Sequence, residues 1–89
     1  MRAVITVIGK DTVGIIYHVS KVLFESNTNI LDISQTVMQE MFTMITLVDM
    51  SKSELGFEDL SMLMKNLEKE LGLSIHVQHE DIFNSMHRI

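Results

Sequence analysis

The segment RAVITVIGKDTVGIIYHVSKVLFE, residues 2–25, changes its hydrophobic period midway and thereby decides the fold. Residues 2–8 are apolar or β-branched at nearly every position, which predicts a strand buried on both faces. A loop over residues 9–14 follows. From Val13 onward, apolar residues recur at helical spacing up to Leu23, which predicts a helix that ends near Ser26.

The remaining chain predicts three further strands and two further helices. Asn27 suits the left-handed position after a helix, and residues 30–39 then alternate between apolar and polar side chains. Residues 42–50 form the hairpin partner, although the turn at 39–41 lacks glycine. Apolar residues at helical spacing over 57–71 predict an amphipathic helix that Gly72 ends. Residues 73–78 predict a fourth strand, and residues 80–89 a short closing helix.

This order, β-α-β-β-α-β plus a C-terminal helix, indicates a single α+β domain over residues 1–89 with a ferredoxin-like sandwich fold. Right-handed crossovers place both main helices on one face of a four-stranded antiparallel sheet. The first and third strands carry apolar residues on both faces, so we expect an uncovered apolar face that includes Met44. Such a face in a small protein indicates an interface, and we expect a homodimer or a larger assembly.

Composition excludes several classes of protein. The net charge of −5 gives no basic surface for nucleic acid, and no apolar run approaches the roughly 20 residues that span a bilayer. Because the chain has no Cys, it can form neither a disulfide framework nor a thiolate metal site. We therefore expect a cytoplasmic protein.

The side chains capable of chemistry do not assemble into a known catalytic pattern. The four His residues lack the i, i+4 spacing of zinc motifs, and His76 and His79 are expected on opposite faces of a strand. No Ser lies in a nucleophile motif. We expect no enzyme, no metal and no cofactor.

The loop over residues 9–14 is a candidate binding site. Gly14 leaves room for close approach of a ligand, and the free amides of the first helical turn favour a carboxylate. Asp11 could bind a nearby ammonium group. An α-amino acid carries both charges, although a glycine near a helix start is also common for turns alone.

Residues 9–15, the following helix and residues 29–33 resemble the ACT domain, over nearly the whole chain. Residues 33–38, 42–44, 77–83 and 86–89 are similar to small stand-alone ACT proteins of unassigned function, and these resemble the regulatory half of glycine cleavage system repressors. Family members usually have Pro in place of Val13 and Gly in place of Asn27.

The resemblance implies a dimeric, non-catalytic regulatory module that binds an amino acid or a related small metabolite. By position it implies binding residues, which are Asp11, Gly14, Ile15, Asn29 and Ile30. The alternative is a protein–protein interaction module that docks on a partner through its apolar sheet face without binding a ligand.

Overall fold

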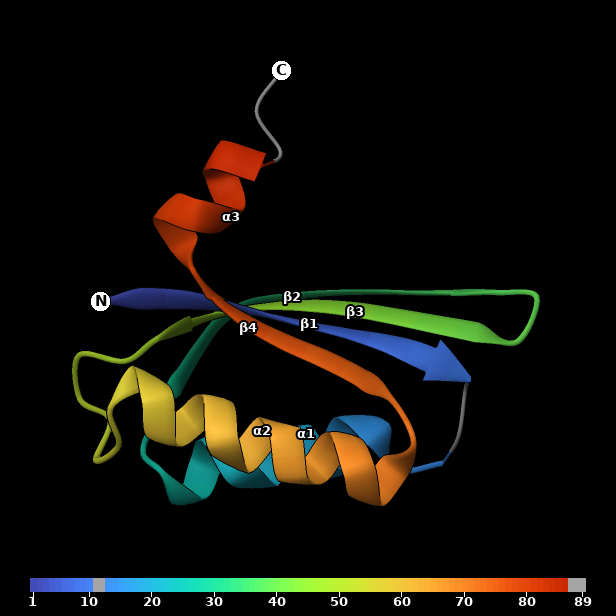
Figure 1. The fold of residues 1–89 in the computed structure, drawn as a ribbon, viewed down its shortest axis with the longest axis horizontal. Helices are drawn as coiled ribbons and strands as arrows, with labels where there is room; N and C mark the ends of the chain where they lie inside the picture. The colour runs from blue at the N-terminus through green and yellow to red at the C-terminus, as the bar shows by residue number, and fades with distance from the viewer. Residues whose placement is uncertain (11–12, 87–89) are drawn as a thin grey trace.

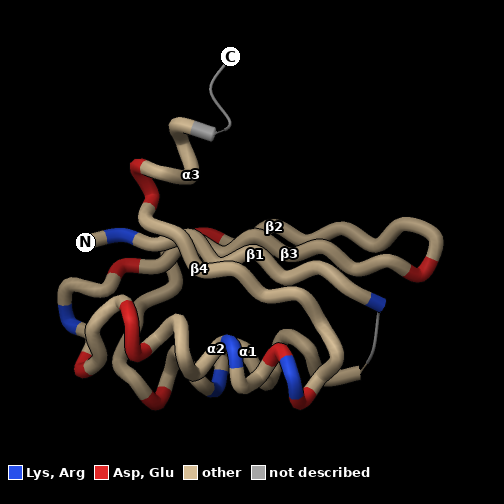
Figure 2. Tube along the Cα trace, in the orientation of Figure 1, with Lys and Arg blue, Asp and Glu red and all other residues tan. Residues whose placement is uncertain are grey.

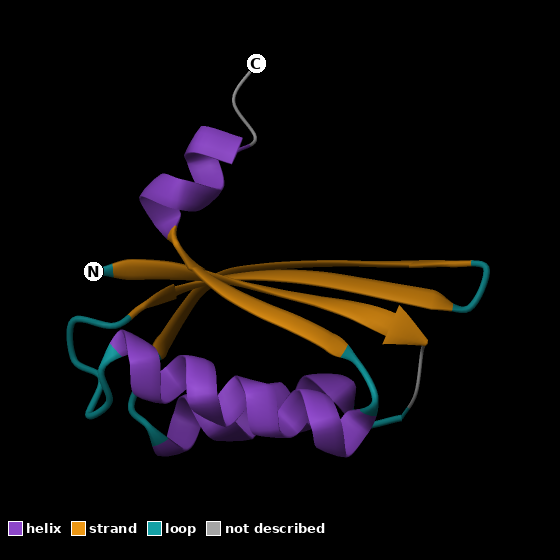
Figure 3. Cartoon of the chain, in the orientation of Figure 1, coloured by secondary structure: helices purple, strands orange, loops and turns teal. Residues whose placement is uncertain are grey.

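The chain folds into one antiparallel sheet with two helices on one face and a third helix on the other side (Figures 1 and 3). This is seen in a computed structural model, which describes residues 1–10 and 13–86. The sheet has the strand order β2-β3-β1-β4, with bounds β1 (Arg2–Lys10), β2 (Asn29–Met38), β3 (Met41–Asp49) and β4 (Ser74–His79). The helices are α1 (Ile15–Glu25), α2 (Phe57–Leu71) and α3 (Glu80–Met86). The predicted ferredoxin-like fold is confirmed.

The core lies between the sheet and the layer of α1 and α2. Alternate residues of β1 point into it, and so do one stripe of each helix and one face of β3. The residues that are at most 2% exposed include Ala3, Ile5, Val7, Ile15, Val19, Leu23, Met44, Val48, Leu60 and Met64. Helix α2 has the predicted bounds, and Gly72 after it has the left-handed conformation with φ of 68°.

The opposite face of the sheet is less apolar than the sequence indicated. Met44 pairs with Val7 and faces the helices at 1% exposure, so its placement on the uncovered face was wrong. Val4 lies on the outer face yet is only 3% exposed, at the end where α3 packs against β1 and β4. Ile8 and Ile45, exposed by 40% and 37%, remain accessible there, as do Met38 and Met41 near the end of the hairpin.

Two element boundaries differ from the prediction because of glycines. β1 continues to Lys10, so Gly9 belongs to the strand; a Cβ at Gly9 would collide with the Leu73 side chain. α1 begins at Ile15, and Gly14 precedes it as the N-cap residue. Gly9 therefore lets β1 pack closely against Leu73, and it does not form a turn.

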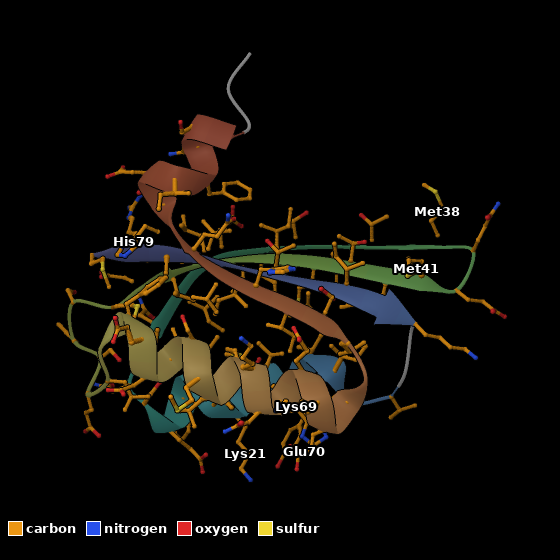
Figure 4. The ribbon with its side chains drawn as sticks, in the orientation of Figure 1. Lys21, Met38, Met41, Lys69, Glu70 and His79 are labelled. Atoms are coloured by element: carbon orange, nitrogen blue, oxygen red, sulfur yellow. The ribbon has the colours of Figure 1, made fainter. Side chains whose placement is uncertain are left out.

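The hairpin between β2 and β3 turns without glycine. Gln39 and Glu40 both have positive φ, at 49° and 70°, which is the type I′ geometry that suits strand twist. Asn27 also has positive φ, at 58°, as predicted. Met38 and Met41 flank the turn and are exposed at the tip of the hairpin (Figure 4).

β2 is an edge strand, and all ten of its residues are exposed. A register shift between Ile30 and Asp32 leaves Leu31 as a bulge. Beyond the bulge, Ile33 and Val37 lie on the helix-facing side of the sheet but are 43% and 55% exposed. The helix layer therefore does not cover this edge.

Charged residues lie mainly on the helices and at the ends of the strands (Figure 2). β1 carries its charges at its two ends, Arg2 and Lys10, and β3 carries only Asp49, at its end. None of the described helices is long and apolar enough to cross a membrane.

Candidate ligand-binding site

The start of α1 has backbone amides that no carbonyl within the helix can accept. Gly14 has φ of 91° and ψ of 4°, and no side chain of the described residues caps the helix. The first amides of a helix have no carbonyl partner within it, so they can bind an anion. The Ile15 side chain is 2% exposed and packs in the core, so only its backbone can reach a ligand. Asp11, the proposed ammonium partner, lies outside the described residues.

The His18 side chain lies beside Gly14. A Cβ built on Gly14 would lie 3.6 Å from Cδ2 of the half-buried His18 ring. The His18 backbone amide donates a hydrogen bond of 3.0 Å to the Gly14 carbonyl, and the Tyr17 ring packs edge-on at 5.3 Å. The surface beside the helix start is therefore aromatic and polar.

The other predicted residues, Asn29 and Ile30, lie at the far end of α1. They begin β2, after the 11 residues of the helix. At 1.5 Å per residue the helix is about 16 Å long. Within one protomer, Gly14 and Ile15 are thus separated from Asn29 and Ile30 by the length of α1.

Asn29 lines a cavity of about 490 Å³ between the end of α1 and the end of β3. Three segments form its walls, and their lining residues are Phe24, Asn27, Thr28, Asn29, Asp49, Ser51 and Lys52. Sequence reasoning did not single out Asp49 and Lys52, because Asp49 ends β3 and Lys52 follows it, some 20 residues after Asn29 in the chain. We call this space the loop cavity.

Hydrogen bonds between the loop over residues 26–28 and the loop that follows β3 hold the walls of the loop cavity in place. Asn27 donates through Nδ2 to the Lys52 carbonyl at 3.0 Å. Ser26 and Thr28, which are 5% and 6% exposed, have hydroxyl oxygens 2.9 Å apart. The Thr28 hydroxyl donates to the Ser53 hydroxyl at 3.0 Å, and Ser53 donates to the Ser26 carbonyl at 3.2 Å. The Ser26 hydroxyl itself donates to the Leu23 carbonyl at 3.1 Å. We call the linked side chains of Ser26, Thr28 and Ser53 the hydroxyl cluster; it joins the end of α1 to the loop after β3.

Asp49 supplies a carboxylate to the loop cavity. The Ser51 backbone amide donates to its Oδ1 at 2.9 Å. This bond and the Ser51 hydroxyl lower the pKa of Asp49, the N-terminal ammonium and Arg2 act in the same direction, and slight desolvation opposes them. Asp49 is therefore ionised at neutral pH and can bind a cation.

Residues 1–10 and 13–86 contain no group of three or more His, Cys, Asp or Glu side chains that could hold a metal ion. His79 instead stacks on Phe57, with ring centroids 4.1 Å apart. His76 lies on the outer face, paired with Thr6, while His79 pairs with Ala3 on the helix-facing side. The two histidines face opposite sides, as predicted.

Comparison with known proteins agrees with this architecture. UPF0237 protein CPE1496 of Clostridium perfringens is 57% identical over 89 residues, which cover 100% of both chains. An ACT domain protein from Streptococcus pneumoniae has 41% identity and a TM-score of 0.80, with 93% of each chain covered. A provisionally assigned glycine cleavage system transcriptional repressor shares the fold, with 23% identity and a TM-score of 0.77 over 86% of this chain and 44% of that one.

The sequence profile of the ACT domain matches residues 2–78. ACT domains are regulatory modules, and many of them bind amino acids. The profile, the full-length relative and the solved ACT domain structure all lead to one family. This chain belongs to the ACT domain family.

Proposed function

We propose that this protein is a non-catalytic regulatory module that binds an amino acid or a related small metabolite between the two copies of a homodimer. The observation that carries the proposal is the separation of Gly14 from Asn29 by the length of α1. One protomer holds the two halves of the site at opposite ends of a helix. A second copy, related by a two-fold axis, would bring one half against the other.

The edge of β2 suits pairing with a second copy. The Ile33 amide donates to the Asp32 side chain at 2.9 Å, so it points away from β3. By the alternation of antiparallel pairing, the Gln35 and Val37 amides point the same way. The opposite edge differs: β4 has six residues, and the Ile75 amide already donates to Glu68 Oε2 at 2.6 Å. β2 is thus the longer and more open edge.

An apolar flank lies beside the β2 edge. Val22 of α1 lines a groove with Leu63 of α2, so this side of α1 faces the other helix. Ile16 and Phe24 lie on the other side of α1 and are 40% and 85% exposed. Together with Ile33 and Val37 of β2, these two side chains give an exposed apolar surface. The same surface of a second protein copy could cover it. We call these four residues the α1–β2 flank.

Antiparallel pairing of two β2 strands would also set the two α1 helices antiparallel. The start of α1 in one protomer would then approach the end of α1 in its partner. Gly14 would lie near the partner's Asn29, and the ligand would bind where they meet. This supports a site that is complete only in the dimer.

A substitution at the strand edge tests the assembly. Gln35→Pro removes an amide that points away from β3, so the ladder inside the protomer should survive. Gln35→Ala retains that amide and is the matched control. In sedimentation equilibrium, we expect wild type and Gln35→Ala to have the mass of a dimer and Gln35→Pro that of a monomer. A monomeric wild type at micromolar concentration would contradict the proposal.

A thermal-shift screen against the twenty common L-amino acids tests ligand binding. A ligand at about 100 times its dissociation constant adds about 2.7 kcal/mol to the free energy of unfolding. We expect at least one amino acid to raise the melting temperature of wild type, and to do so less for Gln35→Pro. Each amino acid is tested at about 1 mM, which is about 100 times a dissociation constant of about 10 μM. If none of them raises the melting temperature, ligand binding is refuted.

Docking of a partner protein on the outer sheet face is the second candidate function. Its support is the partial exposure of Ile8 and Ile45 in the middle of that face. The α1–β2 flank exposes more of its apolar side chains, so we favour association through the flank.

A further inference from the structure

We propose that the loop cavity recognises the two charges of an α-amino acid, with Asp49 binding the ammonium group and Lys52 binding the carboxylate. This inference rests on the proposed function, and it moves charge recognition from the β1–α1 loop to the opposite end of α1. Asp49 takes the role that was predicted for Asp11.

The loop cavity carries one charge of each sign on its walls. Asp49 and Lys52 both line it, and neither forms an ion pair within residues 1–10 and 13–86, where Arg2 and Glu80 pair at 3.3 Å. Asp49 accepts the Ser51 amide through Oδ1, and its carboxylate has further lone pairs that can accept from an ammonium group. A zwitterion could therefore satisfy both groups, whereas an amine or a simple acid would satisfy only one.

The walls that carry these charges are held before a ligand arrives. The Asn27 amide fixes the backbone of Lys52, and the Ser51 amide orients the Asp49 carboxylate. Thr28 lines the cavity, is buried, and belongs to the hydroxyl cluster. Because the loops are already bonded to each other, binding requires little further ordering of the backbone.

Phe24 connects the loop cavity to the proposed dimer contact. It lines the cavity, belongs to the α1–β2 flank and is 85% exposed. A second copy seated on the flank would cover Phe24 and place its own Gly14 amides near the cavity. Covering the cavity would exclude water and strengthen both ionic contacts.

Four variants test this assignment. Asp49→Asn and Lys52→Gln each remove one charge from the cavity, and the side-chain amide introduced by Asp49→Asn retains an oxygen that can accept the Ser51 amide. Glu70→Gln and Lys69→Gln remove the same charges from the last turn of α2, in the helix layer and away from the cavity (Figure 4). Each variant is titrated with the amino acid that gives the largest thermal shift on wild type, after its mass confirms the same assembly.

We expect Asp49→Asn and Lys52→Gln to raise the dissociation constant about 10- to 100-fold, the range for loss of one charge-assisted hydrogen bond. The two α2 variants should bind like wild type. The N-acetyl derivative and the methyl ester of the same amino acid should each bind at least about tenfold more weakly than the parent compound.

Wild-type affinity in both cavity variants would overturn this inference and leave the proposed function standing. Wild-type affinity for the N-acetyl derivative would overturn the role of Asp49 in the same way. If no amino acid shifts the wild-type protein, the proposed function fails and this inference fails with it. Should Asp49→Asn not fold, Lys52→Gln decides the result, because the Lys52 side chain is exposed.

Discussion

The replacement of Thr46 by Val should make the protein more stable. Thr46 is 1% exposed on the helix-facing side of β3, between Ile5 and Ile33 of the neighbouring strands. Its Oγ1 has no hydrogen-bond partner within the described part of the chain. Burying a hydroxyl without a partner costs about 1–3 kcal/mol, and Val has nearly the same shape. We expect the free energy of unfolding to rise by about 1 kcal/mol or more.

The same replacement at Thr28 should have the opposite effect. Thr28 is also buried, at 6% exposure, but its hydroxyl lies 2.9 Å from the Ser26 hydroxyl and 3.0 Å from the Ser53 hydroxyl in the hydroxyl cluster. Thr28→Val removes both of these contacts, while the Ser26 hydroxyl still donates to the Leu23 carbonyl and the Ser53 hydroxyl to the Ser26 carbonyl, so the cost is that of two lost hydrogen bonds. We expect a loss of about 1–3 kcal/mol.

Urea denaturation followed by circular dichroism measures both effects. All proteins are compared at one concentration, because association would stabilise the folded state by mass action. The slope of the free energy against urea should not change, which shows that the same surface unfolds. For a chain of this size, a gain of about 1 kcal/mol raises the melting temperature by about 4–8 °C. The reasoning would be refuted if Thr46→Val lowered the free energy of unfolding, or if both replacements changed it in the same direction.

Two further predictions concern the hairpin turn and Asp49. Replacing Gln39 by Asn and Glu40 by Gly should stabilise the protein by about 1 kcal/mol in urea denaturation, since both positions have positive φ; an unchanged midpoint would contradict this. Because the pKa of Asp49 is lower in the folded protein, its contribution to stability is present above the unfolded value and is lost as the pH falls through the folded value. The melting temperature of Asp49→Asn should therefore approach that of wild type as the pH falls from about 5 to about 2, and a constant difference would argue against the assignment.

The elements most accurately predicted from sequence were those with a single strong period. α2 has the predicted bounds because its apolar stripe is continuous and Gly72 can take the left-handed conformation. The sequence predicted that β1 ends two residues too early, because a glycine after a run of strand residues is typical of a turn. Only the packing of Leu73 against Gly9 shows why the glycine lies inside the strand.

The face of β3 was harder to assign from sequence. Both of its faces carry apolar residues, so alternation alone cannot show which one meets the helices. Met44 and Met50 proved to be core residues, at 1% and 6% exposure, while Met38 is 68% exposed at the hairpin tip. Of the eight methionines in the sequence, some therefore lie in the core and others on the surface.

The candidate site was only partly visible in the sequence. Gly14 and Asn29, at the two ends of α1, could be proposed from the sequence because the resemblance to the ACT domain marks their positions, and they stay a prediction. Asp49 and Lys52 were not found, because they lie next to Asn29 only through the pairing of β2 with β3. To predict a ligand site that is built from segments far apart in sequence, the register of the sheet must be known.

The bond between the Ile75 amide and the Glu68 carboxylate limits how far the protein could polymerise. A sheet with two open edges can add copies at both ends and grow into a filament. Here a carboxylate from the neighbouring helix already occupies an outward amide of the six-residue strand β4, while on the ten-residue strand β2 the Ile33 amide is bonded only to the side chain of its neighbour Asp32. When two copies pair through their β2 edges, neither copy keeps an open β2 edge. Association would therefore stop at a dimer, and further copies could not add to form a fibre.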